Sequence, residues 1–368
     1  IKYNNKFEKA SWEEVYKIIK SKIKNTSKDK ICGFTGDLTN METGYIFKEL
    51  FDRTIENKNY ESRFTKRFLD ISDRESYLFN SKINGIEEAD LILLVGTNPR
   101  FEATILNARI RKSYLNNKIK IVSINDLGDL TYPYESLDGK TETIKRIFEG
   151  NHSISKEILE SKKPMIILGE SLLKINSASF LYFLIKEFLS KNRKLNDEWN
   201  PLNILSTDAA TVGSFELDII NYEKDLIKDL NENKFEIVYL LGRDNLAFNK
   251  KNEFVIYQGS HGDSGAGIAD IILPGAAYTE QNGYFTNLEG KFQKAYKASY
   301  PPGEAKEDWQ IINELAEFMN NRKLFNDKDE LDSSMINYIN LKKEHSNSQK
   351  IAIQNKENFK SENLKIKY

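Results

Sequence analysis

A short apolar run closed by a glycine recurs along the chain and limits the folds that it can adopt. In the clearest case, five consecutive apolar residues, Leu91–Val95, lie between Asp90 and Gly96. A run of this length is too short for an ordinary helix and is typical of a strand buried on both faces, as in a parallel sheet. The glycines that close the four such runs are Gly36, Gly96, Gly169 and Gly242. Because a helical pattern follows each glycine, the sequence predicts an α/β fold with doubly wound, mostly parallel sheets.

The remaining apolar periodicity places the other elements. Strands are predicted over residues 30–34, 91–95, 118–124, 164–169, 202–205, 235–242, 253–258 and 269–273. Helices are predicted over residues 11–23, 41–53, 102–114, 141–149, 154–160, 177–189, 222–231 and 308–319. Helix 102–114 is expected to bury one side formed by Ile105, Ala108, Ile110 and Leu115.

This pattern predicts two Rossmann-like domains. The expected divisions are an opening helix and linker at 1–30, a first domain at 31–150, a second domain at 151–320 and a polar peripheral tail at 321–368. The tail is rich in Lys, Asn, Glu, Asp and Ser, so we expect it to wrap a neighbour or to remain mobile.

Composition excludes several functional classes. Lys and Arg number 54 against 55 Asp and Glu, so no basic surface for nucleic acid is expected. No apolar run approaches the ~18 residues that span a bilayer, so no direct membrane insertion is expected. Cys32 is the single cysteine, which rules out an internal disulfide or a four-thiolate site, and it is expected to be buried and inert. His152 and His345 have no second ligand candidate at metal spacing, so no metal site built from this chain alone is expected.

The turn Gly96-Thr97-Asn98-Pro99 has two interpretations. Its amides and the Asn98 side chain could bind a phosphate or a nucleobase at the carboxyl end of the strand. Alternatively, Gly96 frees the backbone and Pro99 starts the next helix, with no ligand involved. A complete Gly-x-Gly-x-x-Gly fingerprint follows none of the strands, so a nicotinamide cofactor is not expected.

Two later segments also combine glycine with functional side chains. Residues 259–267 contain Ser260, His261 and Asp263 among four glycines. The three side chains are sequence neighbours, whereas members of a catalytic triad come from separate elements, so a glycine-rich loop is favoured over a hydrolase site. Residues 282–290 predict a hairpin-like turn.

Several blocks together resemble one protein family. They are residues 88–103, 107–113, 129–132, 258–263, 268–280, 287–290, 301–303 and 307–309. In this order they are similar to the carboxy-terminal part of the large iron–sulfur subunit of respiratory complex I, which has the molybdopterin-oxidoreductase fold. The resemblance covers roughly residues 8–320.

The resemblance implies a structural subunit of the NADH-dehydrogenase module of NADH:ubiquinone oxidoreductase, itself without catalytic residues or cofactors. It implies that the iron–sulfur clusters lie in a partner chain, the amino-terminal half of the same subunit, and that other NADH-module subunits are further partners. The implied location is the matrix side of the mitochondrial inner membrane or, for a bacterial source, the cytoplasmic side.

In catalytic members of this fold, a cysteine, selenocysteine or serine binds molybdenum, and an Asp-Pro-Arg turn holds the pterin dinucleotide. The corresponding turn here is Asn125-Asp126-Leu127, and only Ser72, Ser76 and Ser81 are available near the ligand position. The resemblance therefore implies a degenerate pterin site at Gly96, Asn98, Pro99, Asn125, Asp126 and Leu127. An active molybdopterin oxidoreductase and a free-standing metabolite-binding protein remain the alternatives.

Overall fold

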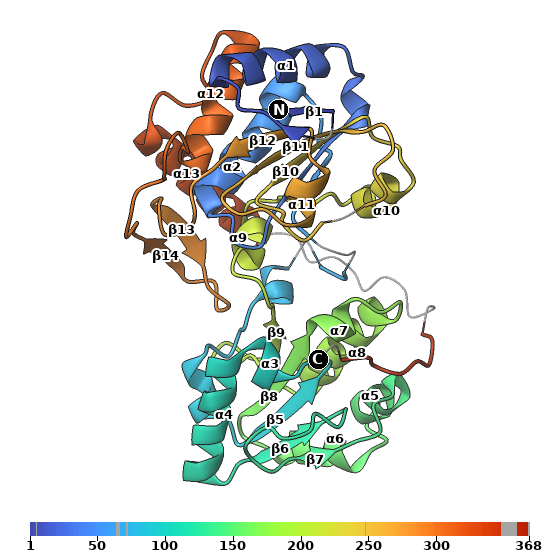
Figure 1. Cartoon of the computed structure of the whole chain (residues 1–368). Helices are drawn as coiled ribbons and strands as arrows, with labels where there is room; N and C mark the ends of the chain where they lie inside the picture. Colours follow the sequence, from blue (N-terminus) through green and yellow to red (C-terminus); the bar gives the residue numbers. More distant parts are fainter. Residues whose placement is uncertain (5, 64–66, 71–72, 247, 347–358, 367–368) are drawn as a thin grey trace. The chain divides into compact units, whose positions relative to one another are not determined.

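The structure is a computed structural model that describes residues 1–4, 6–63, 67–70, 73–246, 248–346 and 359–366 (Figure 1). Its contacts divide the chain into two compact units. Unit 1 comprises Ile1–Lys66, Asp208–Asn287 and Phe292–His345. Unit 2 comprises Arg67–Thr207, Leu288–Lys291 and Ser346–Tyr368.

Unit 1 is built on a five-stranded parallel sheet. Its strands in spatial order are β12 (Ile271–Pro274), β11 (Phe254–Gly259), β10 (Ile237–Leu241), β3 (Ile31–Thr35) and β4 (Tyr60–Glu61). Numbered along the chain, this is the order 5-4-3-1-2, so the chain winds outward in both directions from the β3–β10 pair. In such sheets ligands bind at the carboxyl ends of the strands where the winding reverses.

Helices and two small antiparallel pairs complete unit 1. They are α1 (Trp12–Lys24), α2 (Met41–Leu50) with a π-helical turn (Phe51–Ile55), α9 (Thr211–Glu216), α10 (Leu226–Asn231), α11 (Ser264–Ile268), α12 (Asp308–Asn320), α13 (Lys328–Ser346), β1 (Lys2–Tyr3) with β2 (Lys6–Phe7), and β13 (Gly283–Thr286) with β14 (Phe292–Ala295). Ser11 caps α1, since the Ser11 side chain accepts a hydrogen bond from the Glu14 N–H. Cys32 is buried, in agreement with prediction.

The prediction of a peripheral tail at 321–368 is wrong over helix α13. Residues Lys328–Ser346 form α13, and Leu331, Met335 and Ile339 on this helix are buried in the core of unit 1. These residues recur at intervals of four, which places them on one helical face despite the polar composition around them. Further on, Leu364 is buried in unit 2, where its N–H donates to the Gly139 carbonyl.

Unit 2 contains the second parallel sheet. Its spatial order is β7 (Glu135–Ser136), β6 (Lys120–Ser123), β5 (Leu91–Val95), β8 (Pro164–Gly169) and β9 (Leu202–Leu205). Along the chain this is the order 3-2-1-4-5, so the winding reverses between β5 and β8. The helices are α3 (Pro99–Glu102), α4 (Thr104–Asn117), α5 (Thr141–Phe148), α6 (Ser153–Glu160), α7 (Glu170–Leu173) and α8 (Ala178–Lys191), with 3₁₀ turns at Arg74–Tyr77 and Asn84–Glu87.

The strand pairing contradicts the predicted domain boundaries. β3 belongs to the same sheet as β10, although more than 200 residues separate them, and β5 pairs with β8 across the predicted boundary near residue 150. The helix predicted within segment 1–30 is present as α1, but it is not separate from the domain that follows, because Ile19 on α1 is buried in the core of unit 1. Apolar runs identify strands but not their partners, so the strands were predictable and the domain boundaries were not.

The buried side of α4 also differs from prediction. Ile110 is buried together with Leu106, whereas Ile105 is 79% exposed and Leu115 is 49% exposed. No helix in the part of the chain that the structure describes is long and apolar enough to cross a membrane.

Candidate functional site

The turn after β5 lies where the winding of the unit 2 sheet reverses. Gly96 has a φ of +68°, which disfavours other residues, and Pro99 is the first residue of α3. A β-carbon on Gly169, at the end of β8, would lie 2.4 Å from the Gly96 carbonyl oxygen. The two strand ends are therefore in direct backbone contact at the position where a ligand would approach the sheet.

Two hydrogen-bond donors of this turn are bonded to a carboxylate of the same chain. The Thr97 hydroxyl and the Asn98 N–H both donate to the Glu102 carboxylate, the latter at 3.2 Å. Burial raises the pKa of Glu102, and these two hydrogen bonds oppose that shift. The turn at a helix start is the place where an external phosphate would be bound by free donors. Here an internal carboxylate occupies them.

Asn98 connects the turn to the neighbouring one. Its side chain is fully buried, its Nδ2 donates to the Leu127 carbonyl at 3.2 Å, and its Oδ1 accepts from the Arg100 N–H at 3.2 Å. Both ends of the amide are thus used by the protein. Arg100 itself pairs with the Asp129 carboxylate at 2.6 Å.

The turn Asn125-Asp126-Leu127 is closed by other parts of unit 2. Asp126 accepts from the Gly128 N–H at 3.0 Å and from the Tyr134 hydroxyl at 2.9 Å, and these bonds lower the pKa of its carboxyl. The Leu127 N–H donates to the Tyr134 oxygen at 2.7 Å, and the Leu127 side chain is buried. Asn125 Nδ2 donates to the Leu364 carbonyl at 3.0 Å.

The structure therefore brings the six predicted positions together at one edge of one sheet, and it shows what they contact. The serines considered as metal ligands are also engaged. Ser76 donates to the Asp70 carbonyl at 2.8 Å, and Ser81 donates to the Asn200 carbonyl at 2.6 Å. Ser72 and the side chain of His345 lie outside the described residues. At this edge the Thr97 hydroxyl, the Asn98 N–H and the Asn98 amide are bonded within the chain, an arrangement that does not fit a pterin dinucleotide, which needs free donors.

The glycine-rich loop of unit 1 does not assemble a triad. Ser260 Oγ lies 2.8 Å from Nδ1 of the adjacent His261, and both residues are exposed. Between His261 and Asp263, both of them described, the structure has no hydrogen bond. Across the described ranges, no three His, Cys, Asp or Glu side chains form a group that could hold a metal ion.

A small cleft of about 110 Å³ lies at the carboxyl edge of the unit 1 sheet, next to this loop. One wall is Asp308, the first residue of α12. Its two carboxylate oxygens accept from Gln258 Nε2 at 2.8 Å and from Gln281 Nε2 at 2.7 Å, and Gln258 in turn accepts from the Tyr239 hydroxyl at 2.6 Å. Burial raises the pKa of Asp308 to about 6, although the two glutamine bonds oppose the shift. Pockets for drug-sized ligands are about 300–1,000 Å³, so this cleft is small for a dinucleotide.

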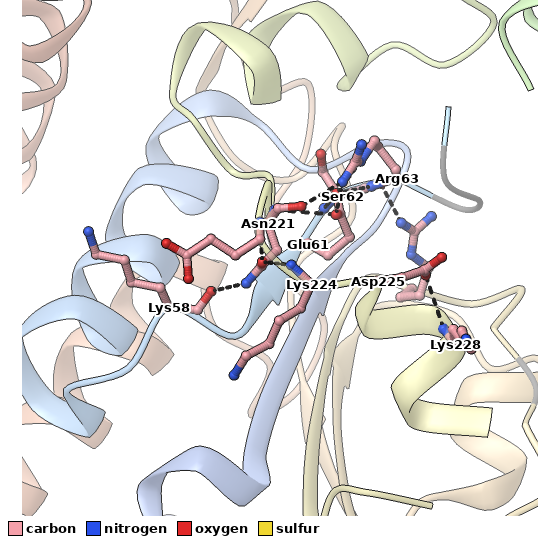
Figure 2. Close-up of polar contacts among 10 residues, drawn as sticks. Lys58, Glu61, Ser62, Arg63, Asn221, Lys224, Asp225 and Lys228 are labelled. Atoms are coloured by element: carbon pink, nitrogen blue, oxygen red, sulfur yellow. Dashed lines mark hydrogen bonds and ion pairs between the residues drawn. The ribbon is translucent and has the colours of Figure 1, made fainter. Parts of the chain in front are cut away.

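A second polar cluster joins the end of β4 to Asn221 (Figure 2). Glu61 is buried, and its carboxylate accepts from Arg63 Nε at 2.9 Å, Arg63 Nη2 at 2.6 Å and the Asn221 N–H at 3.3 Å. Arg63 Nη2 also donates to the Asn221 carbonyl at 2.9 Å. The guanidinium of Arg243, 1% exposed, donates to Asp37 at 2.8 Å and to the Ser62 carbonyl.

Sequence reasoning missed both polar networks. Asp308 is predicted only as a helix start, and Glu61 lies in a stretch whose pattern is polar and irregular. The local pattern contains no signal for either one, since their partners are far away in sequence.

Comparison with known proteins identifies relatives. Residues 1–318 match the family model described as Molybdopterin oxidoreductase. The chain is 35% identical over 379 residues to the NADH-ubiquinone oxidoreductase 75 kDa subunit of Reclinomonas americana, covering 98% of this chain and 55% of that protein. It is 39% identical over 320 residues to an NADH-quinone oxidoreductase subunit of Rickettsia bellii, covering 86% of this chain and 46% of that protein. The chain thus spans about half the length of the curated relatives it matches.

Among solved structures, a chain of the formyltransferase/hydrolase complex of Methylorubrum extorquens, determined with methylofuran, has a TM-score of 0.60 at 10% identity. The alignment covers 86% of this chain and 98% of that one. At this identity the likeness concerns the fold alone. The resemblance and the fold class predicted from sequence are both confirmed.

Proposed function

The chain belongs to the molybdopterin oxidoreductase family, and we propose that it is a structural subunit of the NADH-dehydrogenase module of respiratory complex I with no redox centre of its own. Its identity to NADH dehydrogenase subunits over most of its length supports the complex I role. The same identity supports a place in the peripheral arm, on the matrix side of the mitochondrial inner membrane or the cytoplasmic side of a bacterial membrane.

One observation carries the non-catalytic role, namely that the Glu102 carboxylate occupies the donors of the turn after β5. In a working pterin site these donors would have to face the ligand. A half-buried carboxylate at the same place also repels a phosphate, because two anions would share one set of donors. The role that fits this arrangement is to brace the iron–sulfur-bearing half of the subunit.

Metal and pterin analysis of the purified full-length chain tests this role. We expect no stoichiometric molybdenum and no pterin, with iron present only when a cysteine-rich partner co-purifies. One molybdenum per chain would overturn the proposal in favour of an active molybdopterin-dependent oxidoreductase. A cofactor-free chain that migrates alone, apart from any NADH dehydrogenase, would instead favour a metabolite-binding protein.

A further inference from the structure

Helix α4 of unit 2 has apolar residues on two opposite sides. Its inner side, with Leu106 and Ile110, is buried in the core of unit 2. Its outer side carries Ile105 and Leu115, which are 79% and 49% exposed, and Ala108 between them is also exposed. An exposed large aliphatic residue is common by itself, but a second apolar side on one helix needs a further explanation.

The spacing on the outer side is that of a coiled-coil seam. Ile105, Ala108, Lys112 and Leu115 follow one another at intervals of three, four and three residues. At about 100° per residue, they fall within an arc of about 80°, on the side of the helix opposite the buried one. Such a narrow stripe is typical of the a and d positions of a coiled coil, in which one polar a residue sets the register.

The charged side chains of α4 itself all have one sign. Residues 104–117 contain three basic side chains and no carboxylate. Arg109 and Arg111 flank the seam at its e and g positions. One carboxylate, Glu87, pairs with both Arg109 at 2.8 Å and Lys112 at 3.2 Å, while Arg111 Nε donates to the Thr131 carbonyl at 3.3 Å. The surface is therefore locally cationic, although the whole chain has a net charge of only −1.

We propose that the outer side of α4 docks an amphipathic helix of another polypeptide, with aliphatic residues on its seam and Asp or Glu at the flanking positions. Charge complementarity at the e and g positions determines which helix binds, and burial of Ile105 and Leu115 against that helix stabilises the contact. A membrane surface fits less well, because the helix of an interfacial anchor presents a large apolar face, and here arginines border a narrow one. That the partner is an NADH-module subunit rests on the function proposed above.

Site-specific photocrosslinking locates the partner. Ile105 is replaced by p-benzoylphenylalanine in the full-length chain, and the assembled complex is irradiated and analysed by mass spectrometry. The matched control carries the same group at Lys156 on α6, whose side chain is 80% exposed. We expect position 105, but not position 156, to crosslink to an acidic helical segment of another subunit. A crosslink to lipid, to nucleic acid, to a basic segment or to this chain itself would overturn the proposal.

Charge reversal tests the recognition. Arg111→Glu is expected to lower co-purification with the crosslinked subunit about tenfold, as loss of complementary charge does at interfaces. Lys156→Glu should leave it unchanged. Both variants should keep the thermal midpoint of the isolated chain, and an Asp/Glu→Lys change at the crosslinked site should restore binding to Arg111→Glu. If Arg111→Glu co-purified with the crosslinked subunit as well as the wild-type chain does, the proposal would be refuted.

If the proposed complex I role were wrong, the co-purification result would differ from that expected when only the docking proposal is wrong. The chain would then not co-purify with an NADH dehydrogenase, whatever its α4 contacts. If position 105 still crosslinks to an acidic helix of another protein and Arg111→Glu abolishes that binding, the docking surface stands.

Discussion

The carbonyl oxygen of Gly242 lies 1.7 Å from the point that a β-carbon on Gly36 would occupy. These glycines end β10 and β3, the two strands between which the winding of the unit 1 sheet reverses. Gly96 and Gly169 stand in the same relation in unit 2. In each unit one glycine of the pair has a positive φ, +58° at Gly242 and +68° at Gly96, and presents its carbonyl to the other glycine. All four glycines singled out by sequence thus serve the same purpose, which is close contact between two strand ends.

Gly36→Ala is therefore expected to destabilise the protein by about 3 kcal/mol or more, because the obstacle is backbone and cannot rotate away. Chemical denaturation measures the change. The matched control is Gly267→Ala on α11, where an added β-carbon meets nothing within 4 Å and the residue is helical. That variant should be neutral or slightly stabilising. Equal stability of the two variants would contradict the packing described here.

Asp308→Asn should change the pH dependence of stability. The pKa of Asp308 is raised from 3.8 to about 6 in the folded state, so the fold binds the proton more tightly than the unfolded chain. The contribution of the Asp308 carboxyl to the free energy of unfolding is favourable below pH ~4 and is lost as the pH rises to ~6. Relative to wild type, Asp308→Asn should thus become more stable between pH 4 and pH 7, by up to ~3 kcal/mol.

Asp126→Asn should change the pH dependence of stability in the opposite direction to Asp308→Asn. Hydrogen bonds from Gly128 and Tyr134 lower the pKa of Asp126, so its contribution is present at neutral pH and lost on acidification. This variant should lose stability relative to wild type as the pH rises. Denaturation of both variants at pH 4 and pH 7 measures the two trends. Parallel behaviour would show that the hydrogen bonds of Asp308 and Asp126 do not act as described.

Glu61→Gln should cost about 3 kcal/mol of the free energy of unfolding. Glutamine has one acceptor oxygen in place of two, whereas Glu61 accepts from both Arg63 nitrogens and from the Asn221 N–H within a buried site. The control is Glu236→Gln, whose partner Lys30 is about half exposed. Exposed ion pairs contribute little, so its change should stay within about 1 kcal/mol.

Asn98→Ala should cost about 2 kcal/mol, because it removes two hydrogen bonds and leaves the Leu127 carbonyl buried without its donor. Asn117→Ala, which removes one exposed hydrogen bond to the Glu87 carbonyl, is the comparison and should be nearly neutral. If Asn98 were instead kept for a ligand, its replacement would leave the stability of the ligand-free chain unchanged. Thermal unfolding of both variants distinguishes these outcomes.

The strands and their closing glycines were predictable because each rests on a local signal, an apolar run and a residue that permits a close turn. Pairing was not, since β3 and β10 meet only after 200 residues of intervening chain. The buried face of α4 is ambiguous in sequence because both of its sides are apolar, and periodicity cannot say which side is buried. The contacts of Glu61 and Asp308 depend on tertiary neighbours that no short pattern contains.

The interleaving of the two units has a consequence for synthesis on the ribosome. All five strands of the unit 2 sheet lie within residues 91–205, so this sheet can form while the rest of the chain is still being made. The unit 1 sheet cannot form as early, because β3 emerges from the ribosome early and its neighbour β10 emerges about 200 residues later. During that interval an apolar strand with an unpaired edge is exposed to other nascent chains. Slowed translation or lost chaperone assistance should therefore damage unit 1 before unit 2.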